Sequence, residues 1–254
     1  MSQNETAAPA RHARKTRLKA LAVRPALIAL AAAGMIAGSA GLAAASTLTV
    51  YSGAWSGYAA TNGTYTSVSA SWVLPTLASC SASSTQDARF WVGLDGYSDA
   101  TVERIGIDGV CEDGATVYQA WYEMPPLTYW MSYDPRPGDH ISASVTYKGS
   151  NAFSLYIADT TQGWGRTVTA TLAGAPRSSA EVIVEDPVGS SGSNLPLTDF
   201  GTVNFTGATV NGSALGNAGG LTAINLVDSE GQSMDTISAL SGGENFSATW
   251  RRSS

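Results

Sequence analysis

Regular alternation of apolar and polar residues is the feature that most constrains how this chain can fold. In the segment 139–148, Ile141, Ala143, Val145 and Tyr147 stand at every second position. A period of two matches a β-strand with one buried face, whereas an amphipathic helix would need a period of 3.6. The same spacing recurs in segments that begin at residues 153, 168, 182, 203, 224 and 246. The chain is therefore predicted to be all-β, folded as an antiparallel sandwich or barrel.

Turn signals separate these segments. Gly149, Ser150 and Asn151 lie between two alternating runs and predict a β-hairpin. A second turn is expected at residues 163–165 (GWG), before the run of Val168, Ala170 and Leu172. After residue 45 no segment has the apolar stripe of a helix, which also favours an all-β fold.

The first 45 residues differ from the rest of the chain. Six basic residues precede an almost uncharged run from Pro25 to Ala45, which ends in three alanines before Ser46. This order predicts a secretory signal peptide at 1–45, with residues 46–254 exported as one domain that leaves the membrane. The apolar run is also long enough to span a bilayer, so an uncleaved anchor is the alternative.

Removal of this leader would leave a strongly acidic protein. The leader holds six of the 14 Lys and Arg residues and one of the 20 Asp and Glu residues, which leaves eight and 19 and a net charge of −11. Such a charge repels phosphate backbones, so no nucleic-acid partner is expected. It suits an acidic exterior, where carboxylates lose their charge and repel one another less.

The shortage of histidine and lysine excludes several kinds of chemistry. After residue 45 the chain has one histidine, His140, and one lysine, Lys148. A histidine-rich zinc site is therefore excluded, and no metal is expected. A Ser-His-Asp triad would have to use His140, and no G-x-S-x-G elbow is present. Without a P-loop or a G-x-G-x-x-G motif, no nucleotide cofactor is expected either. Of the catalytic chemistries considered, one that uses carboxylate side chains remains.

Two carboxylates stand out by their context. Glu185 ends the apolar segment 182–184, and Glu123 lies among aromatic residues in the segment 118–125. An apolar environment raises the pKa of a carboxyl group, which suits acid–base catalysis. The alternative is that each is a solvated charge at a strand end, or a buried acid with a structural role.

Two cysteines, Cys80 and Cys111, follow the leader. In an exported protein such a pair usually forms a disulfide, which is the interpretation preferred here. A metal site would need further ligands that this chain does not offer nearby.

Ordered motifs along the chain resemble those of the glutamic peptidases, or eqolisins, and of their bacterial members in particular. The most distinctive is FWVGLDG at residues 90–96. The others are WSGY at 55–58, VSASWVLP at 68–75, VERIG at 102–106, YQAWYEM at 118–124, SAEVIVE at 179–185, LPL at 195–197 and FSATW at 246–250. Together they cover nearly all of the chain after the leader.

This resemblance implies a fold and an activity. The fold would be an antiparallel two-sheet β-sandwich similar to the concanavalin A type lectins, with a substrate cleft across one sheet. The activity would be that of a secreted acid endopeptidase, a monomer that cleaves protein or peptide substrates with a Glu/Gln dyad and no metal or cofactor. By position the catalytic glutamate is Glu185. The residues that match the lining or support of the cleft are Trp91, Asp95, Trp121 and Glu123.

The chain departs from the family pattern at the second catalytic position. The family motif reads V-E-Q-I-G, and here Arg104 replaces the glutamine. An arginine can donate hydrogen bonds to an oxyanion, but it has no acceptor with which to orient a water molecule. A cation beside Glu185 also favours the ionised carboxylate and weakens it as a base. Impaired turnover or a shifted pH dependence is therefore expected.

Two other functions are compatible with these residues. One is a binding module whose cleft holds a peptide or a polysaccharide without cutting it, which Arg104 would favour. The other is a structural secreted sandwich without any cleft function. Turnover of a protein substrate at acid pH distinguishes the peptidase from both.

Overall fold

The computed structural model describes residues 47–189 and 192–253 of the chain. The signal peptide expected at 1–45 lies outside the described residues. Within these ranges the regular structure consists of strands and one short 3₁₀ helix, η1 (Leu215–Asn217). No helix in this part of the chain is long and apolar enough to cross a membrane.

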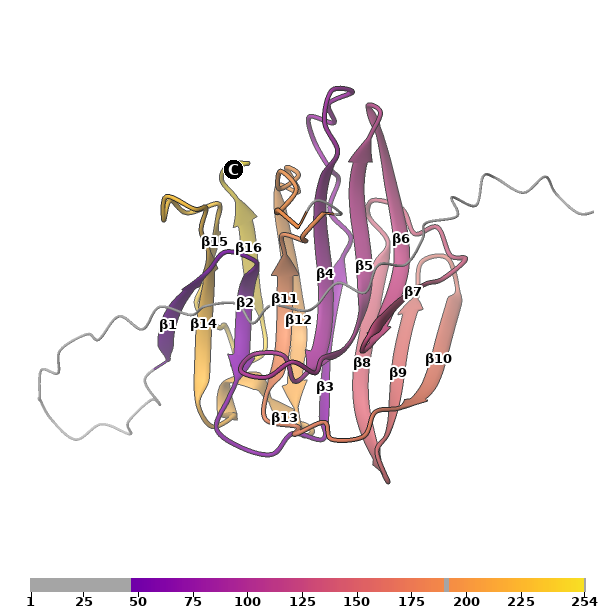
Figure 1. Cartoon of the computed structure of the whole chain (residues 1–254), viewed down its shortest axis with the longest axis vertical. Helices are drawn as coiled ribbons and strands as arrows, with labels where there is room; N and C mark the ends of the chain where they lie inside the picture. Colours follow the sequence, from indigo (N-terminus) through magenta and orange to yellow (C-terminus); the bar gives the residue numbers. More distant parts are fainter. Residues whose placement is uncertain (1–46, 190–191, 254) are drawn as a thin grey trace, which may run out of the picture.

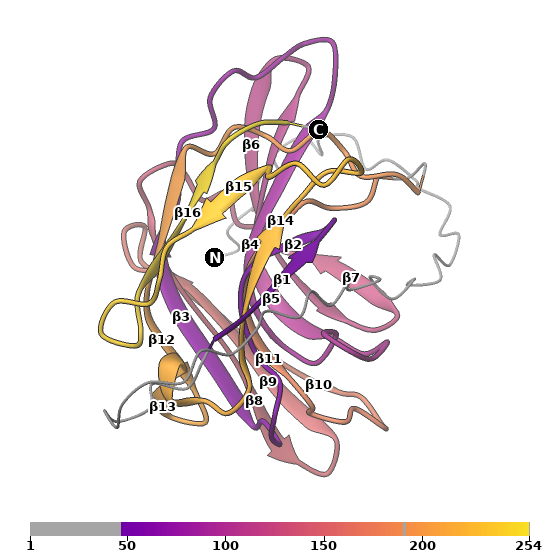
Figure 2. The ribbon, with the colours of Figure 1, turned by 90° about the vertical axis from the view of Figure 1, so that its left-hand side faces the viewer.

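The strands form two sheets, which face each other as layers in Figure 2. Sheet A contains, in spatial order, β1 (Leu48–Ser52), β14 (Leu221–Leu226), β2 (Trp55–Ala60), β11 (Ala180–Glu185), β4 (Gln86–Leu94), β5 (Glu103–Glu112), β6 (Ala115–Met124) and β7 (Leu127–Trp130). Sheet B contains β10 (Trp164–Thr171), β9 (Ala152–Asp159), β8 (His140–Gly149), β3 (Ser67–Val73), β12 (Thr202–Val210), β16 (Phe246–Trp250) and β15 (Asp235–Ile237), with β13 (Ser213–Ala214) beside β12.

Neighbouring strands pair antiparallel, apart from the parallel pair β1 and β14. The predicted antiparallel two-sheet β-sandwich is thereby confirmed. Strands that are far apart in the sequence lie side by side in sheet A. β11 lies between β2 and β4 and pairs with both (Figure 1). This insertion positions the site described below.

The hairpin between β8 and β9 follows from its turn residues. Ser150 and Asn151 have φ of 52° and 61°, which is the left-handed conformation that both central residues of a type I′ turn require. The next predicted turn is displaced, because β10 already begins at Trp164 and the chain reverses before it. Trp164 stacks on Tyr133 at 4.4 Å, and this contact holds it in the sheet.

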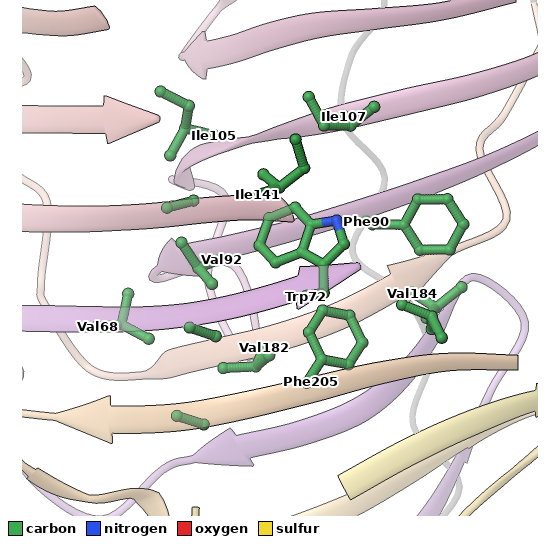
Figure 3. Packing of buried hydrophobic residues seen from close by; sticks show 14 of the residues in the cluster. Val68, Trp72, Phe90, Val92, Ile105, Ile107, Ile141, Val182, Val184 and Phe205 are labelled. Atoms are coloured by element: carbon green, nitrogen blue, oxygen red, sulfur yellow. The ribbon is translucent and has the colours of Figure 1, made fainter. Parts of the chain in front are cut away.

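The main core fills the space between the sheets. Trp72 on β3 packs against Phe205 on β12 at 5.6 Å between ring centroids, and Phe205 stacks on Phe246 of β16 at 4.9 Å. Figure 3 shows Trp72 and Phe205 with Val182 and Val184 of β11, which point into the same core. Each large side chain buried in this way contributes roughly 1.5–3 kcal/mol.

A disulfide connects Cys80, in the loop before β4, to Cys111 near the end of β5. The pairing preferred from the sequence is therefore present. Cys111 is fully buried, and the hydroxyl of Thr198 donates a hydrogen bond to its sulfur at 3.3 Å. The bond ties the loop before β4 to the sheet that carries the site.

Candidate active site

The candidate site lies on the distal face of sheet A, defined here as the face that points away from sheet B. Val182 and Val184 of β11 point into the core, so Ile183 and Glu185 point to the distal face. In the same way Trp91 of β4 and Trp121 of β6 face this side, where they pack with Ile183 in a second apolar cluster. Alternate residues of each strand thus point either into the core between the sheets or into the candidate site.

Two glycines open the floor of the site. A Cβ atom on Gly106 of β5 would lie 2.1 Å from the carbonyl oxygen of Phe90 and 2.6 Å from the Cβ of Trp91. A Cβ atom on Gly93 of β4 would lie 2.9 Å from the ring of Trp91 and 3.0 Å from the Cβ of Arg104. These positions therefore need glycine so that the Trp91 ring and Arg104 can lie close to the sheet.

Glu185 is the residue on which the site converges. Its Oε2 accepts a hydrogen bond from Nη1 of Arg104 at 2.6 Å and another from Nε1 of Trp91 at 2.8 Å. Glu185 as a whole is 7% exposed. Its Oε1 accepts no hydrogen bond from any described residue, which leaves this oxygen available for a water molecule or a ligand.

Arg104 bridges Glu185 to a second glutamate. Its Nε and Nη2 donate to Oε2 of Glu123 at 3.3 and 3.0 Å. The hydroxyl of Thr128 on β7 donates to the same oxygen at 3.1 Å. Register explains the contact, because Arg104 on β5 stands directly opposite Glu123 on β6. One cation is thus shared by two buried carboxylates.

Aromatic rings enclose the guanidinium group of Arg104. Its Cζ lies 5.0 Å from the ring centroid of Trp91 and 5.2 Å from that of Trp121. Burial acts to lower the pKa of Arg104, but the adjacent Glu185 and Glu123 outweigh it and raise that pKa above its ordinary value. Arg104 therefore stays cationic, and the three charged groups have a net charge of −1 when both glutamates are ionised.

A second ion pair lies beside the first and was not predicted. Nε of Arg89 on β4 is 3.3 Å from Oδ1 of Asp108 on β5, directly opposite in the sheet. Asp87 lies two positions before Arg89, and its pKa is raised by burial and then by the negative charge of Asp108. A signal existed in the sequence, because Asp87, Arg89 and Trp91 follow a period of two.

Five of the six predicted peptidase-site residues come together in this structure. They are Trp91, Arg104, Trp121, Glu123 and Glu185. Trp55 of β2, which the site analysis of the sequence missed, meets Trp91 edge-on at 5.0 Å. Its W-S-G-Y motif was visible, but only the pairing of β2 with β11 places it here.

Asp95, the sixth residue, has different neighbours. It is fully buried, and its carboxylate accepts hydrogen bonds from the backbone N–H groups of Arg177 at 2.8 Å and Ser178 at 2.6 Å. These bonds go to the loop before β11 rather than to Glu185 or Arg104. Its geometry therefore suits support of the strand that carries Glu185.

The arrangement can hold and move a proton at Glu185 and donate hydrogen bonds beside it. Three of the five N–H donors of Arg104 are used by the two glutamates, which leaves one each on Nη1 and Nη2. Among residues 47–189 and 192–253, no group of three or more His, Cys, Asp or Glu side chains is arranged to hold a metal ion.

An antiparallel sandwich with a buried glutamate in contact with a nitrogen donor on one sheet face is the architecture expected of a glutamic-type peptidase. Residues 53–250 match the peptidase A4 family. The chain belongs to this family, and its relatives support a peptidase that acts on protein or peptide substrates.

Several relatives show how far the likeness extends. Aspergillopepsin-2 of Aspergillus niger is 31% identical over 193 residues, which covers 65% of this chain and 67% of that protein. The crystal structure of aspergilloglutamic peptidase from the same organism is 30% identical with a TM-score of 0.57, covering 65% of this chain and 99% of that one. Scytalido-glutamic peptidase with a transition state analog inhibitor has a similar fold, with a TM-score of 0.66, 23% identity, and coverage of 78% and 98%.

Proposed function

We propose that this protein is a secreted acid endopeptidase in which Glu185 activates water and Arg104 stands where the family has glutamine. The observation that carries the proposal is the hydrogen-bonding of Glu185. Arg104 and Trp91 both donate to Oε2, so the carboxylate is held in one orientation with Oε1 available. A fixed carboxylate with one free oxygen is what a general base requires.

The proposed reaction uses this geometry directly. Oε1 of Glu185 accepts a proton from a water molecule as its oxygen attacks the scissile carbonyl carbon. The remaining N–H groups of Arg104 donate to the carbonyl oxygen as it becomes negative. Glu185 then returns the proton to the amide nitrogen, the C–N bond breaks, and a carboxylic acid and an amine leave.

Arginine is expected to slow this cycle compared with glutamine. It supplies donors for the oxyanion but no acceptor to orient the water molecule. Its contacts with Glu185 and Glu123 also occupy three of its five N–H groups, so only two remain for the oxyanion. Loss of one well-placed group at such a site typically lowers turnover about 10²–10³-fold.

Cleavage of a denatured protein between pH 2 and 7 tests the proposal. The exported protein should cut, Glu185→Ala should be inactive, and Arg104→Gln should cut about 10²-fold faster than the parent. Near-ultraviolet circular dichroism establishes that each variant is folded. Undiminished cleavage by folded Glu185→Ala would refute the assignment of the base.

The ion pair also favours a second candidate function. Because Arg104 engages both Glu185 and Glu123, the site could hold a peptide or a polysaccharide without hydrolysing it. In that case the parent would bind peptide without turnover, and Arg104→Gln would restore cutting. Equilibrium binding measured alongside product release separates the two functions.

Export and assembly belong to the same proposal. The basic head and apolar run of residues 1–45 support a cleaved signal peptide, and the disulfide suits an oxidising exterior. N-terminal sequencing of protein from the culture medium should begin at Ser46. Sedimentation should give a monomer of residues 46–254.

A further inference from the structure

Two arginines, Arg89 and Arg104, lie on the distal face of sheet A. Among the basic residues after residue 45, these two alone stand on the described strands of this sheet. Phe90 and Val92 of β4 point into the core, so Arg89 points to the distal face, as Glu185 does. A strongly acidic protein thus places the basic side chains of this sheet on the face of the candidate active site.

Three neighbours hold Arg89 in place. Its Nε donates to Oδ1 of Asp108 at 3.3 Å. Its Cζ lies 5.3 Å from the ring centroid of Trp121 on β6 and 5.7 Å from that of Trp130 on β7, and these two tryptophans stand directly opposite each other in the sheet. A guanidinium that is fixed by a carboxylate and two rings loses little conformational freedom when it binds a ligand.

The outer end of this guanidinium is free. Nη1 and Nη2 of Arg89 form no hydrogen bond with any described residue, and neither is a buried nitrogen without a partner. The side chain is 18% exposed, so both nitrogens are open to solvent in the cleft. Four of its five N–H groups are therefore available, in the planar fork that binds a carboxylate through two parallel hydrogen bonds.

The carboxyl groups around Arg89 do not occupy this fork. Asp108 takes only the Nε side. Burial raises the pKa of Asp87 well above its ordinary value, and the negative charge of Asp108 raises it further, so Asp87 stays protonated in acid and adds no negative charge. Glu185 forms no ion pair with Arg89, because its Oε2 is engaged by Arg104 and Trp91. A ligand carboxylate can thus bind where no protein carboxylate does.

The position of Arg89 relates this fork to the bond that is cut. Arg89 on β4 stands directly opposite Glu185 on β11, and its guanidinium extends away from β11 toward the rings on β6 and β7. Neighbouring strands are about 4.8 Å apart, and an extended peptide advances about 3.3 Å per residue. A group bound to Arg89 therefore lies about two or three residues from the peptide bond beside Glu185, on the side of β7.

We propose that Arg89 determines specificity by binding a carboxylate of the substrate about two or three residues from the scissile bond. The carboxylate belongs to an Asp or Glu side chain or to the C-terminus of a short peptide. This inference rests on the proposed function, because it names the substrate class of the same cleft. Since the acidic protein repels anions elsewhere, the preference should be confined to one or two adjacent substrate positions.

Fluorescence anisotropy with labelled eight-residue alanine–serine peptides tests this subsite. Each amidated peptide carries one Glu, moved along the chain, and is compared with Gln at the same position at about pH 5.5, where a Glu side chain is ionised. The protein carries Glu185→Gln, which keeps an acceptor for Arg104 and prevents turnover. At one or two adjacent positions Glu should bind about tenfold more tightly than Gln.

The source of the carboxylate follows from a second set of peptides. In these, every Glu is replaced by Gln and the C-terminal amide by a free carboxylate. A gain of similar size from the free terminus would assign the chain end as the group that Arg89 binds, and a gain limited to the Glu peptides would assign the side chain. Equal binding of all these peptides would overturn the proposal.

Variants of Arg89 show whether it carries the preference. Glu and Gln peptides should bind equally to Arg89→Gln. Because that change leaves Asp108 buried and unpaired, Arg89→Gln with Asp108→Asn removes both charges and should give the same result in a folded protein. Arg251→Gln is the matched control, because Arg251 is exposed after β16, and it should keep the preference.

A preference for Glu that survives in both Arg89 variants would refute the role of this residue. Failure of the peptidase proposal has a different signature. A folded parent that cuts no protein substrate, while the Glu185→Gln protein still shows the position-specific preference, would contradict the peptidase and support the carboxylate subsite.

Discussion

Arg104 shows how one residue organises a buried site. Its cation lies between Glu123 and Glu185 and between two tryptophan rings. Bringing three charged groups out of water is costly, and close charge-assisted hydrogen bonds offset that cost only while all partners are present. The residue is therefore a structural element of this site as well as a candidate catalytic group.

Removal of Arg104 should destabilise the fold at neutral pH. Arg104→Ala leaves Glu123 and Glu185 about 90% buried, without their shared cation and repelling each other, so the free energy of unfolding should fall by about 3 kcal/mol. Urea unfolding measures this. Arg251→Ala is the control, because Arg251 is exposed and its change should stay within about 0.5 kcal/mol. Equal stability of the two variants would show that the ion pairs contribute nothing net.

At the scale of elements, the contact between β4 and β5 determines how deep the site lies. The strands pair over their full length, and Gly106 stands opposite Trp91. Because Gly106 has no side chain, the indole of Trp91 can lie where its Nε1 reaches Glu185 on the neighbouring strand β11. The close packing of β4 on β5 and the hydrogen bond from Trp91 to Glu185 therefore depend on the same residue, Gly106.

A single methyl group should disturb this contact. In Gly106→Ala the new Cβ would lie 2.1 Å from the carbonyl oxygen of Phe90, so the strands must separate and stability should fall by about 3 kcal/mol. Gly53→Ala is the matched control, because its nearest neighbour would be 3.9 Å away. Thermal unfolding compares the two variants. The total tryptophan fluorescence, to which Trp91 contributes, should change only in Gly106→Ala, and an unperturbed Gly106→Ala protein would contradict the close approach.

For the molecule as a whole, buried carboxyl groups connect stability to pH. Burial raises the pKa of Glu103 to about 8, with a further rise from Asp95 and Asp99. Burial likewise raises the pKa of Asp186 to about 7 and that of Asp235 to about 6. In the folded protein these groups keep protons that the unfolded chain releases above about pH 4.

The free energy of unfolding should therefore fall as pH rises from about 4 to about 8, because the unfolded state binds fewer protons than the folded state. Urea midpoints across this range measure the effect. Glu103→Gln should reduce the loss between pH 4 and pH 8 by about 1 kcal/mol or more, since its amide does not titrate. The exposed Glu112→Gln should leave the loss unchanged. A protein that gains stability toward pH 8 would disprove this account.

Part of the site could be predicted from the sequence, and part could not. Glu185, Arg104, Trp91, Trp121 and Glu123 were identified through ordered motifs, and the structure brings them together, although their catalytic roles stay predictions. Arg89 and Asp108 were missed because an ion pair across two strands depends on register, which local spacing does not reveal.

The sequence by itself determined the all-β class, the family and the pairing of its two cysteines. Alternation of side chains is a local property of an extended backbone, and it survives whatever the strand later pairs with. Only the tertiary structure decided that β11 lies between β2 and β4, so that Glu185 meets an arginine 81 positions earlier in the chain. That choice depends on the summed packing of many distant residues, and it directs Arg104 toward two carboxylates at once.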